Sequence, residues 1–382
     1  MESDGELFRL IVENSHEGIA IIDENCRIAY ANSELLKIFG RPKEEIIRQD
    51  FRNFLTEECK ARFTDKRLCA EERRHKNEEK VLSEHRLKIV RKDGAERDIE
   101  VRAVTLRDYK GKFCTIAQVL DITERTKLEA ERKIFEKRLS KLNTYAKKLN
   151  NAKSIKEIYR LALDAMEKTL GFEYASIFIV DENFLKLVAY RGYSKVFSLK
   201  LPLDGEKGIT VKAAKTGKSI IVPDVREEKA YVIGGEETLS ELATPMKIGR
   251  KLLGVLNVES KKPAAFNNDD KKLLELLASH VAIAISNLRR REKLSELNAY
   301  ARTLNKAKSV EEVCTKTLDA MQRILGFKNV DFFLVVGKRL RLVKTRGLNF
   351  TPKLALPLDG DKGITVKAAK TGKTVYVPDV RK

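Results

Sequence analysis

Residues 249–288 read GRKLLGVLNVESKKPAAFNNDDKKLLELLASHVAIAISNL, and this stretch decides the fold of the central part of the chain. KLLGVLNVES and the preceding ELATPMKI are apolar, β-rich runs, and the Gly249-Arg250 pair between them predicts a hairpin turn. From Asp269 to Arg290 the apolar residues recur at helical spacing, which predicts a long amphipathic helix. An antiparallel hairpin followed by a helix that covers it is typical of an α+β domain.

The residues upstream extend the same pattern. Ser154 to Leu170 is predicted to be a helix that begins with a capping box, because Glu157 follows Ser154 by three residues. YASIFIVDE and LKLVAYRG predict a second hairpin, and Gly208 and Gly217 enclose a short helix before the strand SIIVPDV. The predicted order is helix, hairpin, short helix, strand, hairpin, helix, which indicates an α+β fold with an antiparallel sheet.

An internal repeat organises the second half of the chain. LSKLNTYAKKLNNAKSI at Leu139 recurs as LSELNAYARTLNKAKSV at Leu294, an offset of 155 residues. LPLDGEKGITVKAAKTGK from Leu201 matches LPLDGDKGITVKAAKTGK from Leu356 at 17 of 18 positions. A period of this length is a whole domain. The second copy stops at Lys382, so we expect it to lack the final hairpin and helix and to leave a sheet edge where a protein partner could join.

The first copy resembles the GAF domain family over residues 150–290. The resemblance is carried by the stretch from Gly249 to Leu288 and by TVKAAKTGKSIIVPDV, of which TVKAAKTGK recurs in the second copy. It implies a sensory domain that binds a small ligand, and it implies that residues 306–382 are a partial GAF domain.

Residues 5–125 do not align with the repeat. GIAIIDENCRIAYAN predicts two short strands around a turn, SELLKIFG a helix ended by Gly40, and residues 86–123 three antiparallel strands with turns at Asp93-Gly94 and Lys110-Gly111. This segment resembles a PAS domain, carried by GIAIID, Tyr30-Ala31-Asn32, the KDG turn and Asp121-Ile122-Thr123. In that family the last triplet joins the final strand to an outgoing helix.

The outgoing helix has a coiled-coil pattern. Four apolar residues are spaced by seven, namely Leu128, Phe135, Leu142 and Leu149, and Leu139 lies at an intermediate position of the heptad. We expect a signalling helix that pairs in a parallel homodimer. The alternative is a helix that packs on its own GAF domain. The predicted plan is a PAS domain (1–125), a helical linker (126–150), a GAF domain (151–290), a second linker (291–305) and a partial GAF domain (306–382).

Candidate ligand-binding residues lie in the first GAF copy. The Gly208-Ile209-Thr210 stretch opens a helix, whose free backbone N–H groups could receive a phosphate or a carboxylate. Tyr190 and Asp224 are further candidates for this pocket. The residue set of cyclic-nucleotide-binding GAF domains cannot be assembled here, although Phe266 is present, so an unidentified small ligand or no ligand is expected ahead of a cyclic nucleotide.

We assign no cofactor. Asn25-Cys26-Arg27 resembles the core of flavin-adduct motifs, but it falls in a turn between strands rather than on a helix. Each histidine is expected to be an ordinary residue rather than a haem or metal ligand: His16, His75, His85 and His280. A bilin would need a pocket cysteine, and the first GAF copy has none, since the cysteines are Cys26, Cys59, Cys69, Cys114 and Cys314. The sequence therefore indicates no flavin, haem, bilin or metal.

Charge and hydropathy argue against three further interpretations: a nucleic-acid-binding protein, a membrane-spanning protein and a secreted protein. The net charge of +20 invites a nucleic-acid interpretation, but acidic residues are interleaved with the basic ones and no recognition motif appears. The longest uncharged run, Leu276 to Leu288, is too short to span a membrane. The N-terminus lacks the pattern of a secretory signal, so a cytoplasmic location is expected.

No phosphate-binding loop, nucleophile elbow or kinase catalytic loop is present, so we expect no catalysis by this chain. The sequence indicates a sensory module of signal transduction, like prokaryotic proteins that combine PAS and GAF domains. Two alternatives stay open. The chain could be the sensory front of a two-component histidine kinase whose phosphorelay core is elsewhere, or a basic nucleic-acid-binding regulator.

Overall fold

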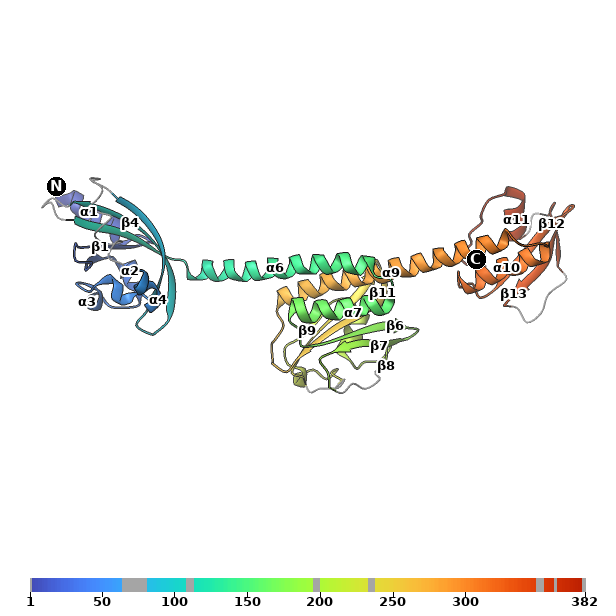
Figure 1. Ribbon diagram of the computed structural model, residues 1–382, viewed down its shortest axis with the longest axis horizontal. Coiled ribbons are helices and arrows are strands. Elements are labelled where there is room, and N and C mark those ends of the chain that lie inside the picture. The colour runs from blue at the N-terminus through green and yellow to red at the C-terminus, as the bar shows by residue number, and fades with distance from the viewer. Residues whose placement is uncertain are drawn as a thin grey trace. The chain divides into compact units, whose positions relative to one another are not determined.

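The computed structural model describes residues 2–63, 81–107, 113–194, 200–232, 238–347, 354–360 and 363–379. Helices and antiparallel sheets alternate along the chain (Figure 1), which confirms the predicted α+β class. The chain divides into two compact units, residues 1–137 and 138–382. In the described ranges, no helix is both long enough and apolar enough to cross a bilayer. Cys69, His75 and the Lys110-Gly111 turn lie outside the described residues.

The first unit is a five-stranded antiparallel sheet with short helices packed on it. The strand order is β2-β1-β5-β4-β3. Its elements are α1 (Glu2–Glu13), β1 (Gly18–Ile22), β2 (Ile28–Ala31), α2 (Ser33–Phe39), α3 (Lys43–Ile46), η1 (Phe51–Phe54), α4 (Glu57–Phe63), β3 (Val81–Val90), β4 (Glu96–Arg107) and β5 (Phe113–Asp121). Gly40 ends α2 in the left-handed conformation, as predicted. The two N-terminal strands and three C-terminal strands of the sequence analysis are confirmed.

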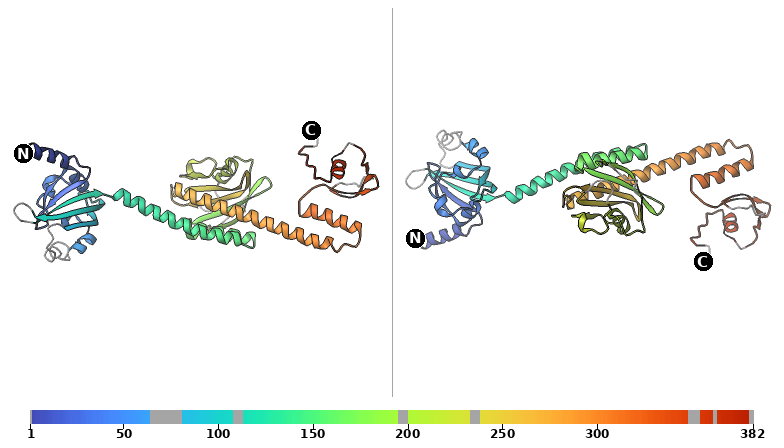
Figure 2. Two further views of the ribbon diagram at one scale, coloured as in Figure 1. Left: turned by 90° about the horizontal axis from the view of Figure 1, so that it is seen from above. Right: turned by 90° about the horizontal axis from the view of Figure 1, so that it is seen from below.

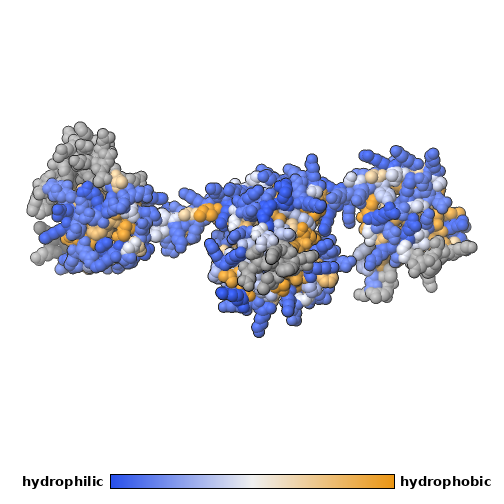
Figure 3. All heavy atoms as spheres, turned by 60° about the horizontal axis from the view of Figure 1, so that its bottom comes forward, coloured by the Kyte–Doolittle hydropathy of each residue, from blue (hydrophilic) through white to orange (hydrophobic). Residues whose placement is uncertain are grey.

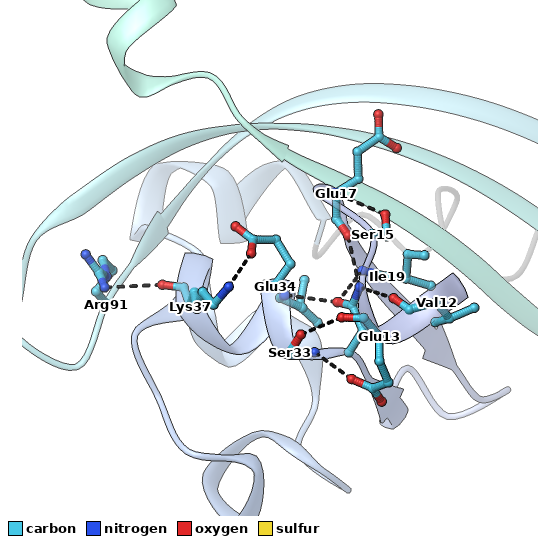
Figure 4. A network of polar contacts seen from close by, with 11 residues as sticks. Val12, Glu13, Ser15, Glu17, Ile19, Ser33, Glu34, Lys37 and Arg91 are labelled. Atoms are coloured by element: carbon cyan, nitrogen blue, oxygen red, sulfur yellow. Dashed lines mark hydrogen bonds and ion pairs between the residues drawn. The ribbon is translucent and has the colours of Figure 1, made fainter. Parts of the chain in front are cut away.

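A buried asparagine, Asn32, holds the N-terminal part of this unit together, and its partners Val12, Glu17 and Ile19 are labelled in Figure 4. The side-chain oxygen of Asn32 accepts hydrogen bonds from the backbone N–H of Ile19 at 2.8 Å and of Leu35 at 3.0 Å. Its amide donates to the carbonyl oxygens of Val12 at 2.9 Å and Glu17 at 3.0 Å. All four bonds that an asparagine side chain can make are therefore formed, and they join α1, β1 and α2.

The predicted junction of strand and helix lies where β5 meets α6 (Thr123–Asn151). The Ile122 side chain is buried, and its N–H donates to the Asp98 carbonyl at 2.8 Å. The Asp121 carboxylate accepts from the Thr123 N–H at 2.9 Å, and the Thr126 hydroxyl donates to the Asp98 carboxylate at 3.0 Å. These bonds attach the first turn of α6 to β4.

The second unit contains a six-stranded antiparallel sheet with the order β8-β7-β6-β11-β10-β9. Its elements are α7 (Ile155–Ala165), η3 (Met166–Leu170), β6 (Tyr174–Asp181), β7 (Phe184–Arg191), β8 (Lys200–Pro202), α8 (Ile209–Thr216), β9 (Ile220–Val222), η4 (Val225–Glu227), β10 (Ser240–Ile248), β11 (Lys251–Ser260) and α9 (Asn268–Leu304). The helix predicted from Ser154 begins with the expected cap, and its last turn is a π-helical turn, η3. Helices α7 and α9 cover one face of the sheet (Figure 1), and α8 packs on β10 and β11.

The C-terminal half of α6 lies along α9 (Figure 2). Arg138 forms an ion pair with Asp270 at 3.1 Å, near the start of α9, and Arg291 donates to the Asn150 carbonyl at 2.8 Å, farther along both helices. The two contacts show that the helices run in the same direction. Helix α9 then continues past the sheet to Leu304.

Residues 310–371 repeat the order of residues 155–216. Helix α10 (Val310–Arg323), β12 (Val330–Val336), β13 (Arg339–Arg346), β14 (Ala355–Pro357) and α11 (Ile364–Thr371) follow one another as α7, β6, β7, β8 and α8 do. The backbone repeats as well. Gly192 and Gly347 have φ values of +90° and +88°, and a Cβ on either would lie 2.0 or 2.1 Å from a carbonyl oxygen. That these residues form a second GAF domain stays a prediction.

Candidate functional site

A pocket in the second unit lies between the start of α8 and the sheet. It encloses about 30 Å³ and opens to solvent beside Tyr190. Four of the five predicted residues line it: Tyr190, Gly208, Ile209 and Thr210. Gly208 precedes α8 with a φ of +101°, which is why a glycine stands at this turn.

The fifth predicted residue, Asp224, is absent from the pocket lining. Its carboxylate caps the short helix η4, accepting from the Arg226 N–H at 3.0 Å and from the Arg226 guanidinium at 2.5 Å. These hydrogen bonds lower the pKa of Asp224 to about 2. In this structure Asp224 therefore has a capping role.

Sequence reasoning missed the polar wall of the pocket. Glu241 on β10 and Glu259 on β11 lie directly opposite each other in the ladder, and Asn257 lies two residues before Glu259 on the same face. All three side chains are buried, with exposed fractions of 4%, 6% and 3%. Two carboxylates and an amide thus meet inside an otherwise largely apolar core.

Hydrogen bonds fix the orientation of this wall. Thr238 donates its hydroxyl to Glu259 Oε2 at 3.0 Å, and Asn257 donates Nδ2 to Glu259 Oε1 at 3.2 Å. The Tyr231 hydroxyl lies 2.9 Å from the Thr238 hydroxyl. Asn257 Oδ1 is buried and has no hydrogen-bond partner among the residues that the structure describes. An acceptor is therefore available in the pocket wall.

Burial changes the acidity of the wall. Burial raises the pKa of Glu241 well above its ordinary value, and repulsion from Glu259 raises it further. Burial also raises the pKa of Glu259, although the hydroxyl of Thr238 and the amide of Asn257 oppose the shift. Burial raises the pKa of Tyr231 to about 12, so this hydroxyl keeps its proton at neutral pH. The pair therefore binds a proton more tightly than exposed glutamates do.

The first unit has a second, more apolar cavity of about 110 Å³ between its sheet and its helices. Its polar lining includes Thr105 and Thr115, whose hydroxyls lie 2.9 Å apart, and His85. Cys26 also lines it, from the predicted turn between β1 and β2, with a φ of +64°. The mostly apolar lining of this cavity suits an apolar ligand.

The predicted helix seam is divided between two environments. Leu142 has an exposed fraction of 1%, and Leu149 is equally buried, so both pack within the second unit. Leu128 is 58% exposed, while Phe135 and Leu139 are half-buried. Apolar atoms show on the stretch of α6 before the GAF domain (Figure 3). The C-terminal half of the seam thus has the environment of the alternative interpretation, a helix packed on its own domain.

Comparison with protein families agrees with this geometry. The chain matches the family model of the PAS fold over residues 6–122 and that of the GAF domain over residues 152–286. The chain therefore contains a PAS domain followed by a GAF domain, and both predicted resemblances are confirmed. These are typical modules of sensory signal transduction.

Individual relatives cover parts of the chain. It is similar to the Nif-specific regulatory protein of Azospirillum lipoferum, with 27% identity over 145 residues, which are 35% of this chain and 23% of that protein. A free methionine-R-sulfoxide reductase of Saccharomyces cerevisiae is 36% identical over 73 residues, 19% of this chain and 41% of the reductase. The chain thus spans less than a quarter of the Nif-specific relative.

Among solved structures, the chain is similar to a GAF domain from a phosphoenolpyruvate-protein phosphotransferase of Coxiella burnetii. The identity is 21% and the TM-score 0.38, with 41% of this chain and 98% of that chain covered. A free methionine-R-sulfoxide reductase of Neisseria meningitidis in complex with its substrate has 18% identity and a TM-score of 0.36, with 39% and 89% covered.

Proposed function

We propose that this chain is a sensory module of signal transduction whose GAF pocket binds a small ligand. The observation that carries the proposal is the buried polar wall of Glu241, Asn257 and Glu259 in a pocket that opens to solvent. Buried polar groups cost free energy unless they have partners, so a pocket wall with an unpaired acceptor favours a ligand that supplies a donor.

The sheet offers a route from the pocket to the connecting helices. Side chains alternate between the two faces of a strand, so Leu242 lies on the face opposite Glu241. Helix α9 packs on that face of β10, and Leu242 is buried. Because α9 continues beyond the sheet to Leu304, a change in the packing of β10 would reach residues outside the domain.

We propose binding rather than catalysis at this pocket. One similar protein is a methionine sulfoxide reductase, but residues 152–286 contain no cysteine, so this segment has no thiol to act as nucleophile or reductant. The proposed mechanism is a population shift, in which the ligand favours one packing of sheet and helix.

Native mass spectrometry of the full chain, purified gently from cells in which it occurs naturally, tests the proposal. We expect a reproducible added mass that disappears under denaturing conditions. Thr210→Phe fills the pocket and should remove that mass, whereas Thr216→Phe, at the exposed end of the same helix, should keep it. A bare wild-type chain, or an added mass that Thr210→Phe leaves in place, would contradict a ligand in this pocket.

We also propose that the exposed half of the seam on α6 pairs with the same helix of a second copy. Leu128 and Ile134 are 58% and 56% exposed, and Phe135 continues the seven-residue spacing of Leu128. Arg132 interrupts the seam, but its charge is paired with Glu136 at 2.7 Å. Two such helices would cover each other's apolar residues.

Light scattering on the full chain tests this pairing. Leu128→Glu places a charge on the seam and should shift the mass from dimer toward monomer. Lys127→Glu, the neighbouring exposed position, should leave the mass unchanged. A monomeric wild-type chain, or a Leu128→Glu chain with the wild-type mass, would refute a dimer through this helix.

A further inference from the structure

The two glutamates of the GAF pocket form a directly opposed pair. In the antiparallel ladder of β10 and β11, Glu241 pairs with Glu259. Directly opposed residues on adjacent strands have Cβ atoms about 5 Å apart, and like charges at such positions repel. Burial strengthens this repulsion because the protein interior screens charge less than water does.

No cation of the described chain neutralises this pair. Among the ion pairs of the described residues, none involves Glu241 or Glu259. The groups that contact Glu259 are neutral, namely the Thr238 hydroxyl, the Asn257 amide and the Tyr193 hydroxyl. Buried carboxylates are normally paired with a cation or hold a proton, so without a cation this pair holds a proton until a cationic ligand replaces it.

The wall also contains more acceptors than donors. Asn257 lines the pocket and uses its Nδ2 toward Glu259, while its Oδ1 is buried and has no partner among the described residues. The four carboxylate oxygens are acceptors as well when they are ionised. A group that carries both a positive charge and several N–H donors would satisfy this wall.

We propose that the ligand of the GAF pocket carries a small ammonium head group that binds between Glu241, Glu259 and Asn257 Oδ1. This inference rests on the proposed function of the pocket. The enclosed volume of about 30 Å³ fits a small head group. Tyr190 and Tyr193 both line the pocket with their rings 6.4 Å apart, and aromatic faces attract organic cations. The remainder of the ligand extends toward Tyr190 and the solvent.

Isothermal titration calorimetry on the full chain tests this inference with simple probes. n-Butylammonium chloride is the cationic probe, sodium butyrate and n-butanol are the anionic and neutral probes of similar size, and tetramethylammonium is a cation without N–H donors. We expect n-butylammonium to bind the wild type at least tenfold more tightly than the other three. Glu241→Gln and Glu259→Gln should each weaken it about tenfold or more, which corresponds to about 1.4 kcal/mol.

Glu182→Gln is the matched control, because it removes the same charge from an exposed turn of the same domain. It should bind n-butylammonium as the wild type does, and equal weakening would overturn the inference in favour of general surface charge. Tighter binding of butyrate or butanol would also overturn it while leaving the proposed ligand pocket intact. If no probe binds the folded wild type, the ammonium inference fails, and native mass spectrometry of the full chain decides separately whether the pocket holds another ligand. Should a glutamine variant not fold, the comparison of n-butylammonium with tetramethylammonium on the wild type decides.

Discussion

The substitution Glu241→Gln should make the stability of the GAF domain less dependent on pH. Burial and the neighbouring Glu259 raise the pKa of Glu241 in the folded state above the value of 4.5 expected for the unfolded chain. Between these two pKa values the folded state binds more protons than the unfolded state does. The free energy of unfolding therefore falls as the pH rises, by up to about 1.4 kcal/mol per pH unit for one proton.

Glutamine has nearly the same shape and no titratable proton, so it removes this contribution. Below pH 4.5 the wild type and Glu241→Gln should have similar free energies of unfolding. With rising pH the variant should become the more stable protein, until the pH passes the raised pKa and the difference becomes constant. Glu259 contributes to the pH dependence in both proteins. The free energy of unfolding of Glu241→Gln should therefore still fall with rising pH, but less steeply than that of the wild type.

Urea unfolding of the full chain, at several pH values between about 5 and 8, measures this difference. Hydrogen exchange mass spectrometry on peptides from β10 and β11 isolates the GAF transition from that of the PAS domain. Glu182→Gln, on an exposed turn, should run parallel to the wild type. If Glu241→Gln also runs parallel to the wild type, Glu241 does not change its protonation on unfolding, and the raised pKa of this buried, directly opposed glutamate is refuted.

Two further substitutions test the packing. Asn32→Ala should destabilise the PAS domain by about 2–4 kcal/mol, because it removes the cap of α2 and leaves buried N–H and carbonyl groups unpaired. Hydrogen exchange of the PAS peptides measures this, and Asn14→Ala, which loses one exposed bond, should cost far less. Leu142→Ala should destabilise the GAF domain by about 2–5 kcal/mol, whereas Leu128→Ala should change its stability by no more than about 0.5 kcal/mol. Equal effects of the two leucines in urea unfolding would contradict the division of the seam.

The sequence predicts the elements of the fold because its signals are local. Glycines at the helix ends and turns, such as Gly40, Gly208 and Gly249, have the left-handed or otherwise positive φ that their positions require. The repeat predicts the order of α10, β12, β13, β14 and α11 from that of the first copy. Three of the five predicted pocket residues, Gly208, Ile209 and Thr210, follow from one local feature, the start of the short helix.

The carboxylate pair was not predictable by counting along the hairpin. Ile248 pairs with Lys251 next to the turn, and that register carried through would place Glu241 opposite Val258. The ladder instead shifts by one residue between Met246 and Lys247, which brings Glu241 opposite Glu259. A single bulge therefore decides whether the two carboxylates lie opposite each other. The residue types at this position do not predict the bulge.

The seam on helix α6 is a second feature that the sequence predicts only in part. Leu128, Phe135, Leu142 and Leu149 share one seven-residue spacing, and that spacing indicates an apolar stripe on the helix. It cannot indicate which surface covers the stripe. In the structure the chain's own GAF domain covers Leu142 and Leu149, so a charge at Leu142 would test the core of that domain rather than a dimer.

Hydrogen exchange mass spectrometry of the full chain, with and without n-butylammonium, tests most directly the claim that a ligand in the pocket changes the connecting helix. We expect slower exchange in β10 and β11 together with altered exchange in α9 beyond the sheet, over residues 294–304, and no change in Glu241→Gln. Protection confined to the pocket, with unchanged exchange in α9, would describe a binding site that transmits nothing and would contradict the proposed sensor.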